Sequence, residues 1–416
     1  MDEITDREAP DAARIWNLIR RAGCVRVPGT SAEPEGRPRD SQALSPGPSG
    51  FRRRIGATPP GVFLFSSRRD GFPPPLKSAM SLDLSSRAAD AYSRRRGRYL
   101  ATVIANIPLC REHNRLSFRI EGFPPSEPGQ FVQVKCRDVD DAPLGDFPER
   151  DLPWAAAALT GSPQPDLWRP TPILRRPFSI AGRRSTPQCE EIDLINRDIG
   201  PGTHWLFELE IGQQVDLIGP LGNTFQLPEP GGTALLVGGG VGIPPMIYIA
   251  QALAALSATA APAQPRHGVA FCGSLSIDLM PLTITDRSGG DGAEPAMNVR
   301  EFAEYGFPTV LSTDDGSYGY HGRVTGALIE FLDRHRDAVP RPVLYTCGPE
   351  PMMKAVAAIA RERGLACQVA VERAMACGMG TCQSCVIRQV AENERGWRYR
   401  LACTDGPVFE ASTLLW

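Results

Sequence analysis

Residues 233–256 read TALLVGGGVGIPPMIYIAQALAAL and carry no charged side chain. A run of this length and polarity could span a membrane as one helix. However, three glycines at 238–240 and the pair Pro244–Pro245 interrupt it in the middle. We interpret it as a buried parallel strand (234–237), a glycine turn and a helix that begins near Pro244 or Pro245. Fully buried parallel strands are continuously apolar, and proline is tolerated in a first helical turn. We therefore expect no membrane span.

The residues that follow repeat the same strand-then-helix pattern. Strand-like runs begin at His267, Pro308 and Pro342, and helical runs cover 326–335 and 351–364. Strands that alternate with helices indicate a doubly wound parallel sheet, in which ligands bind at the carboxyl ends of the strands. The turns VGGGVGIPPM and TCGPEPMM fall at such ends and are candidates for binding a nucleotide. The glycine run lacks the strict G-x-G-x-x-G fingerprint, so a tight structural turn explains it nearly as well.

The residues before 233 have a different pattern. Short segments alternate apolar and polar side chains between turn signals, which indicates an antiparallel barrel. These segments are 98–109, 114–123, 129–136, 192–197 and 213–220. Two polar, Pro- and Ala-rich stretches at 138–172 and 276–300 are expected to be loop insertions.

Two segments within the barrel region suggest a flavin. RRPFSI (Arg175–Ile180) ends a strand, and its arginine and hydroxyl suit a cofactor that has phosphates and a ring nitrogen. GPGTHWLFEL (Gly200–Leu209) opens a helix, where free N–H groups and the helix dipole suit a pyrophosphate. Each segment alone is a weak signal. Their order and separation strengthen the interpretation.

Residues 1–79 are rich in proline and glycine and show almost no periodicity. Such a composition buries too little apolar surface to fold, so we expect a disordered extension. A second hypothesis is that translation starts at Met80, which the intact mass of the native protein would test. Residues 81–96 would then form a short amphipathic, Arg-rich lead-in.

Three cysteines fall within nine residues, CGMGTCQSC, at Cys377, Cys382 and Cys385. The spacing C-x4-C-x2-C followed by a distant cysteine is that of a plant-type [2Fe-2S] centre. Cys403 supplies the fourth thiol after seventeen residues, and 386–403 is predicted to be a hairpin that returns it. A structural zinc site is the alternative, although zinc more often uses paired C-x2-4-C knuckles.

The residues around these cysteines also carry expectations. Gly378 and Gly380 permit backbone angles that bring N–H groups close to the sulfurs. Met375 and Met379 are expected to pack near the cluster and exclude water. The eleven cysteines are an odd number, and the MDEITD start lacks the plan of a signal peptide, which favours a reducing compartment and a cytoplasmic location.

Other functions find little support in the sequence. The net charge of −2 gives no basic field for nucleic acid. We find no Ser/His/Asp arrangement, and the five histidines are scattered, so no catalytic acid–base residue is predicted. His204, beside the Gly-Thr turn, is expected to pack or to cap rather than to do chemistry.

Taken in order, these motifs resemble the ferredoxin–NADP reductase superfamily. VERAMACGMGTCQSCV and LACTDGPVF narrow the resemblance to the electron-transfer subunits of NAD-dependent (type B) dihydroorotate dehydrogenase, over residues 97–416. The resemblance implies an α+β multidomain fold. An antiparallel FAD-binding β-barrel (97–229) would follow the extension (1–96). A doubly wound parallel α/β NAD-binding domain (230–366) and a small [2Fe-2S] module (367–416) would complete the chain.

The resemblance also implies roles for individual residues. The cluster would be held by Cys377, Cys382, Cys385 and Cys403. FAD would be bound by Arg176, Pro177, Phe178, Ser179, Ile195, Asn196, Arg197, Gly202 and Thr203. NAD would be bordered by Gly238, Gly239, Gly240, Gly242, Cys347, Gly348, Pro349 and Glu350. Ser179 would hydrogen-bond the flavin ring, Arg176 would hold an FAD phosphate, and the Cys347 thiol either touches the nicotinamide site or is a small buried side chain.

The implied function is a relay in pyrimidine (UMP) biosynthesis. An FMN-containing catalytic subunit would oxidise dihydroorotate, and electrons would pass through the [2Fe-2S] cluster and FAD to NAD+, in a heterotetramer of two plus two subunits. A flavin is needed because clusters exchange single electrons and nicotinamide takes hydride. The segment GSLSIDLM carries no basic residue for a 2′-phosphate, which favours NAD over NADP.

Two other interpretations stay open. Sulfide- or hydrogen-linked reductase subunits, and ferredoxin–NADP transhydrogenase subunits, share the same plan and differ in their partner. A non-enzymatic redox sensor would need no hydride path, so rapid reduction of bound FAD by NADH would count against it.

Overall fold

The computed structural model describes residues 96–138, 174–259, 267–287, 292–335 and 338–416. The expectations about the extension, the Arg-rich lead-in and the insertion at 138–172 fall on residues outside these ranges, apart from the end residues 96 and 138. The expectation of a loop at 276–300 can be checked for the most part. In its described residues the chain forms only η2 (Ile277–Leu279), the start of the four-residue helix α6 (Arg300–Ala303) and isolated bridges such as Ile284 with Val299.

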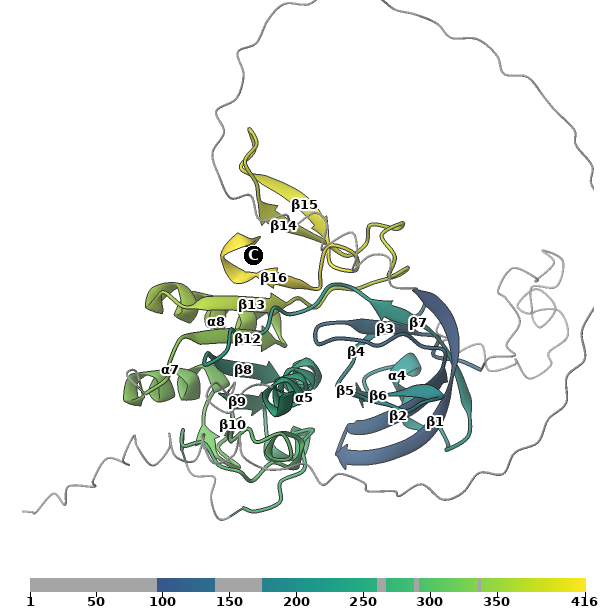
Figure 1. The fold of residues 1–416 in the computed structure, drawn as a ribbon, viewed down its shortest axis with the longest axis horizontal. Coiled ribbons are helices and arrows are strands. Elements are labelled where there is room, and N and C mark those ends of the chain that lie inside the picture. The colour runs from purple at the N-terminus through teal and green to yellow at the C-terminus, as the bar shows by residue number, and fades with distance from the viewer. Residues whose placement is uncertain (1–95, 139–173, 260–266, 288–291, 336–337) are drawn as a thin grey trace, which may run out of the picture. The chain divides into compact units, whose positions relative to one another are not determined.

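The first part of the chain forms a seven-stranded antiparallel sheet that curves into a half-barrel (Figure 1). Alternation along the strands explains it, because side chains such as Leu116, Phe118 and Ile120 face the core at every second position and are fully buried. The strand order is β4-β3-β7-β1-β2-β6-β5. The elements are β1 (Gly97–Cys110), β2 (His113–Glu121), β3 (Phe131–Val134), β4 (Arg176–Ser179), β5 (Gly182–Ser185), β6 (Cys189–Arg197), α4 (Pro201–Phe207) and β7 (Gln214–Leu221).

The second part is a seven-stranded α/β sheet of order β11-β10-β9-β8-β12-β13-β16, parallel except where β16 joins β13. This confirms the predicted doubly wound sheet. The elements are β8 (Thr233–Gly239), η1 (Gly240–Gly242), α5 (Ile243–Thr259), β9 (His267–Ser274), β10 (Thr309–Thr313), β11 (Tyr320–His321), α7 (Val324–Arg334), β12 (Pro342–Cys347), α8 (Glu350–Arg363), β13 (Ala366–Ala370) and β16 (Val408–Glu410).

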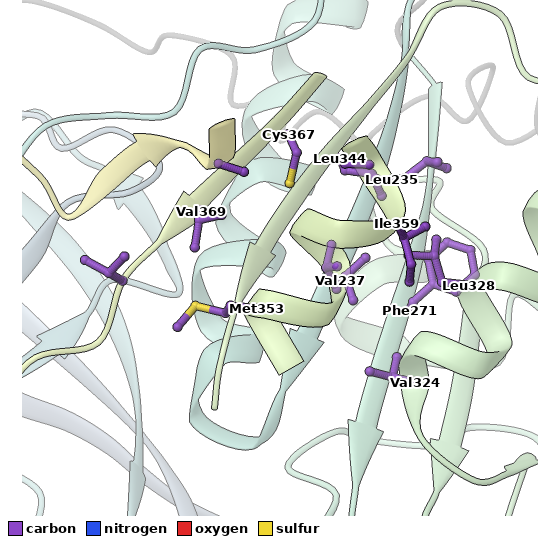
Figure 2. Packing of buried hydrophobic residues seen from close by; sticks show 14 of the residues in the cluster. Leu235, Val237, Phe271, Val324, Leu328, Leu344, Met353, Ile359, Cys367 and Val369 are labelled. Atoms are coloured by element: carbon purple, nitrogen blue, oxygen red, sulfur yellow. The ribbon is translucent and has the colours of Figure 1, made fainter. Parts of the chain in front are cut away.

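Both faces of this sheet are covered by helices. Leu235 and Val237 of β8 pack with Leu328 of α7 and Met353 of α8, as Figure 2 shows. Ala234 and Leu236 point the other way and pack with residues of α5. Continuous apolar strands are therefore explained by burial on two faces.

The opening stretch is the strand, glycine turn and helix expected from the sequence. Within the described residues, 240–258 alone is long and apolar enough to pass for a membrane span, and 56% of its apolar window is buried inside the protein. The helix begins at Ile243, one residue before Pro244, and its side chains Met246, Ile249 and Leu253 are fully buried against the sheet.

The C-terminal segment forms a small three-stranded sheet of order β15-β14-β17. Its strands are β14 (Val386–Val390), β15 (Trp397–Leu401) and β17 (Leu414–Leu415), with η3 (Ala411–Thr413) before the last. β14 and β15 pair antiparallel from Val386 with Leu401 to Val390 with Trp397, which confirms the predicted hairpin. β13 and β16 of the same segment belong to the α/β sheet, so the limits proposed for the domains stay predictions.

Asn223, just after β7, fastens the half-barrel to the C-terminal segment. Its side-chain amide donates to the carbonyls of Asp405 (3.1 Å) and Val408 (2.8 Å), and its oxygen accepts from the N–H of Val408 (2.9 Å). Gly222 allows the close approach, because a Cβ there would lie 2.6 Å from Cδ of Pro407. The end of β7 is thereby held against the cysteine-bearing segment.

Candidate functional site

The four predicted cluster cysteines come together at one end of the small sheet. Cys377, Cys382 and Cys385 lie on the loop between β13 and β14, and the hairpin returns Cys403 to them. The thiol of Cys382 contacts that of Cys377, and the thiol of Cys403 contacts that of Cys385. The four sulfurs are thus arranged as two pairs.

Backbone N–H groups face these sulfurs, as the sequence predicted. The N–H groups of Met379 and Cys382 both donate to Sγ of Cys377 at 3.4 Å, and that of Gly380 points to Cys403. Gly378 and Gly380 have φ of +70° and +89°, angles that other residues rarely adopt. The loop therefore needs glycine at both positions.

The two pairs differ in exposure. Cys385 and Cys403 are 2% and 1% exposed, whereas Cys382 lies at the surface. Hydrogen bonds from the hydroxyl and N–H of Ser384, and then from Cys377, lower the pKa of Cys382 to about 6. Burial, and then the neighbouring Cys385, raises the pKa of Cys403 to about 12.

The arrangement bears on the choice between zinc and iron. A structural zinc ion needs four ligands around one point. Two pairs of thiols, each with its own N–H donors, suit a binuclear centre better than a mononuclear one.

Of the two methionines expected to shield the cysteines, only one is buried. Met375 is 9% exposed and packs in the core, but Met379 is 50% exposed. The expectation for Met379 is therefore wrong, because the tight glycine loop turns its side chain outward.

A cavity of about 400 Å³ lies at the carboxyl ends of β8, β9 and β10, where a doubly wound sheet binds its ligand. Gly239, Gly240 and Pro349 from the predicted nucleotide set line it. The cavity is also lined by His113, Arg197, Gly273, Ser274, Leu275, Leu279, Asp314, Arg323, Val324, Thr325, Pro351, Met352 and Ala355.

The other predicted nucleotide residues lie behind or beside this cavity. Gly238 packs on Ile243, and Gly242 packs on the backbone of Cys347 and Gly348. Cys347 is 7% exposed, and burial raises the pKa of its thiol to about 12, so the thiol is neutral. Glu350 is held by ion pairs to Lys354 and Arg373, both at 2.8 Å. Their contact with NAD stays a prediction.

The structure separates the two arginines of RRPFSI. Arg175 donates to the carboxylate of Asp216 (2.8 Å) and to its carbonyl (2.9 Å). Burial alone would raise the pKa of Asp216, but hydrogen bonds from Arg175 and Arg98 outweigh it and lower that pKa. Arg176 donates to the carbonyl of Leu174 (3.0 Å) and has no carboxylate partner among the described residues. Arg175 is therefore structural, and Arg176 is the arginine left for a phosphate.

The other residues of the FAD prediction fall on β4, β6 and the turn before α4. Pro177, Phe178 and Ser179 are half-buried on β4, Ile195 is buried in the core, and Gly202 is buried in α4. Asn196 donates to the carbonyl of Thr203 at 2.9 Å. Contact of these residues with FAD stays a prediction.

Side-chain hydroxyl and imidazole groups hold the 198–204 turn in place. The Thr203 hydroxyl accepts from the N–H groups of Ile199 (2.9 Å) and Gly200 (3.0 Å). The ring of His204 is exposed and hydrogen-bonds the Asp198 carboxylate at 2.8 Å. It therefore braces the turn, whereas the sequence predicted that it would pack or cap the helix.

Sequence reasoning missed several residues that line the cavity. His113 begins β2, and Arg323 precedes α7, far from the glycine turns in sequence. Arg197, predicted for FAD, reaches the cavity from β6, where Glu112 binds it at 2.9 Å. In the segment GYHGRVTG, a glycine and an arginine directly precede a helix, which is a pattern that could have indicated a phosphate site. Nothing in the segment shows that it lies near the end of β8.

Acid is expected to destabilise the protein through His113. This side chain is 1% exposed, and burial, followed by the charge of Arg197, lowers its pKa to about 4. The unfolded chain binds a proton near pH 6.5 but the folded protein does not, so stability is lost as pH falls from about 6.5 to 4. We expect a loss of about 2 kcal/mol between pH 7 and 5 from this group. Urea unfolding at both pH values should show that the free energy of unfolding falls less in His113→Gln than in the wild type. Equal falls in the two proteins would contradict the assignment.

Comparison with known proteins agrees with this site. The model of the iron–sulfur cluster binding domain of dihydroorotate dehydrogenase B matches residues 372–415. The electron transfer subunit of dihydroorotate dehydrogenase B (NAD(+)) from Geobacillus sp. (strain WCH70) is 36% identical over 319 residues, covering 76% of this chain and 97% of that protein. Its counterpart from Shouchella clausii (strain KSM-K16) is 35% identical and covers 68% and 85%.

A solved structure of the NADH-dependent reduced ferredoxin–NADP oxidoreductase shares the fold, with a TM-score of 0.53 and 24% identity over 76% of this chain and 90% of that one. That likeness concerns the fold alone. The identity to the subunits of the dehydrogenase is higher, at 36%, and covers nearly the whole length of that relative. The chain belongs to the family of electron transfer subunits of the NAD-dependent dihydroorotate dehydrogenase B.

Proposed function

We propose that this chain carries electrons from a dihydroorotate-oxidising, FMN-containing catalytic subunit to NAD+, using a [2Fe-2S] cluster and FAD. The observation that carries the proposal is the pairing of the four thiols, Cys377 with Cys382 and Cys385 with Cys403. Two pairs of thiolates match two irons, and the spacing is that of a plant-type centre. When bound, the groups supply one-electron transfer at the cluster and hydride exchange between flavin and nicotinamide.

The residues of the chain fit the cluster. The inner pair, Cys385 and Cys403, lies in the same hydrophobic core as Phe131 and Leu221 of the half-barrel and is therefore shielded from water. The N–H groups of Met379, Cys382 and Gly380 offset negative charge on the sulfurs. The surface position of Cys382 leaves the outer pair open to a partner.

Arginine charge and cavity volume support the binding of NAD and FAD. Arg197 and Arg323 at the 400 Å³ cavity suit the diphosphate of NAD, and Gly239 and Gly240 leave room for it. Arg176, without a carboxylate partner in the described part of the chain, is the candidate for an FAD phosphate. Ser179, at the end of β4, is the candidate donor to the flavin ring.

The wider setting is also part of the proposal. A subunit named for electron transfer implies a catalytic dihydroorotate dehydrogenase partner, and we propose two copies of each. We place the complex in the cytoplasm and its product in pyrimidine biosynthesis. The ten cysteines of the described residues are all free thiols, which supports a reducing compartment.

The first experiment is a visible spectrum of anaerobically purified protein with iron, sulfide and FAD counts, before and after NADH. Two irons, two sulfides and one FAD, bleached by NADH, are expected. The protein mixed with the catalytic subunit should then reduce NAD+ when dihydroorotate is added. Zinc without flavin would contradict the proposal, and a competent cofactor set without dihydroorotate activity would point to another partner.

Loss of the Arg323 charge is expected to weaken NADH binding by roughly 10- to 100-fold, since a hydrogen bond to a charged group is worth about 1.5–3 kcal/mol. Arg323→Ala can be measured by NADH titration of the FAD-loaded protein. Arg334→Ala is the matched control, because Arg334 lies at the other end of α7 and pairs with Glu294 and Glu330. Equal affinities in the two variants would remove Arg323 from the site.

A further inference from the structure

Gln133 is a glutamine on β3 whose side-chain amide is buried without a partner. The residue is 0% exposed, and neither Nε2 nor Oε1 has a hydrogen-bond partner among the described residues. Buried amides are nearly always hydrogen-bonded, because an unmet donor or acceptor is costly. A group of this kind therefore indicates a ligand that completes it.

The amide is packed directly against the cysteine loop. A Cβ on Gly378 would lie 2.6 Å from Cγ of Gln133 and 3.0 Å from its Nε2. Gly378 immediately follows Cys377, one of the outer pair of thiols. On the other side, Gln133 pairs across the sheet with Pro177 of β4, the strand that carries Arg176 and Ser179. Gln133 thus stands between the strand assigned to flavin and the loop assigned to the cluster.

We propose that the side-chain N–H of Gln133 donates a hydrogen bond to the iron–sulfur centre and raises its reduction potential. The inference rests on the proposed function, since it needs the cluster on the four cysteines. A reduced centre carries one more negative charge than an oxidised one, so a donor stabilises the reduced form more. Hydrogen bonds to cluster sulfurs and burial are known levers on such potentials.

Gln133 differs from the other donors at this centre. The donors described above are backbone N–H groups of the loop itself, at Met379, Gly380 and Cys382. Gln133 comes from the half-barrel, more than two hundred residues earlier in the chain. Its position on β3 is fixed by pairing with β4 and β7. The half-barrel therefore sets a property of the cluster as well as holding the flavin.

The test compares Gln133→Met with Gln368→Met. Gln368 is also buried, at 6% exposed, but its amide is satisfied by the backbone of Gln226. Redox titration followed by electron paramagnetic resonance should show a more negative cluster potential in Gln133→Met, with two irons and one FAD retained. The FAD potential should stay unchanged, and Gln368→Met should shift neither. A fully loaded Gln133→Met protein with the wild-type cluster potential would overturn the inference.

A second measurement needs no variant that might lose the cluster. Wild-type protein labelled with 15N only in glutamine side chains should show a 15N coupling to the reduced centre in pulsed resonance. The exposed Gln383 also lies in the cysteine loop, so the labelled Gln383→Met protein must keep this coupling. No coupling in the wild type, or its loss in Gln383→Met, would overturn the inference. A wild type without two irons would instead contradict the proposed function.

Discussion

Replacing Cys403 by serine is expected to remove the iron–sulfur centre and with it the transfer of electrons from dihydroorotate to NAD+. Cys403 is 1% exposed and pairs with Cys385, and the N–H of Ala402 donates to the carbonyl of Cys385 at 3.0 Å. Serine is a poorer ligand for iron than cysteine, because its hydroxyl is far less acidic than a thiol. Iron and sulfide should fall to near zero. Coupled activity should fall by more than the roughly 10- to 100-fold that changes around a metal ligand cause.

NADH-driven reduction of a dye through FAD separates this loss from unfolding. It should persist in Cys403→Ser, because the half-barrel and the cavity at β8–β10 lie on other elements. Cys367→Ser is the matched control, since Cys367 is a buried thiol of β13, 4% exposed and outside the four. It should lose only about 1–3 kcal/mol of stability for burying a hydroxyl, and keep its iron. Full iron in Cys403→Ser, or equal iron loss in both variants, would remove Cys403 from the ligand set.

The sequence predicted best the features that depend on neighbouring residues. The alternation of apolar and polar side chains indicated the strands of the half-barrel. Two uncharged runs, one before and one after a glycine turn, indicated β8 and α5. The hairpin that returns Cys403 was predictable because β14 and β15 are separated by only six residues, 391–396. The expectation that Gly378 and Gly380 permit a close wrap could be made from the sequence, because tolerance of positive φ is a property of glycine itself.

Features that depend on contacts between distant segments were not predictable. RRPFSI offers two adjacent arginines, and only the buried Asp216 on β7 shows that Arg175 is structural. Likewise, nothing near Gln133 in sequence announces the cysteine loop. His113 and Arg323 meet at one cavity only because β2, β8 and α7 converge there. In each case the partner lies tens to hundreds of residues away, where periodicity and spacing carry no information.

The choice between NAD and NADP also depends on residues that are distant in sequence. The sequence favoured NAD because GSLSIDLM, after β9, has no basic residue. The structure places Arg323 at the same cavity, together with Asp314, so the absence of a local cation did not describe the site. The preference for NAD rests instead on the family to which the chain belongs.

Replacing Gly242 by alanine is expected to destroy the nucleotide site and to destabilise the protein severely. A Cβ at this position would lie 2.1 Å from the carbonyl oxygen of Cys347, 2.3 Å from its carbon and 2.4 Å from the nitrogen of Gly348. All three are backbone atoms, so no flexible side chain can move aside. The turn after β8 would have to separate from the turn after β12, although both border the cavity. Overpacking a core costs about 1–3 kcal/mol, and we expect the upper end or more here.

Gly240→Ala is the control that separates crowding from backbone strain. Gly240 lies two residues earlier in the same turn, has φ of +53° and would have nothing within 4 Å of its Cβ. Its alanine variant should lose about 1–2 kcal/mol for the left-handed backbone and still fold. Urea unfolding of both variants compares the cost of crowding with that of backbone strain, and NADH titration of Gly242→Ala tests the nucleotide site. Equal stabilities would mean that the contact of Gly242 with Cys347 is not what holds the two turns together. A folded Gly242→Ala protein with wild-type affinity for NADH would show that the crossing of these turns does not shape the site.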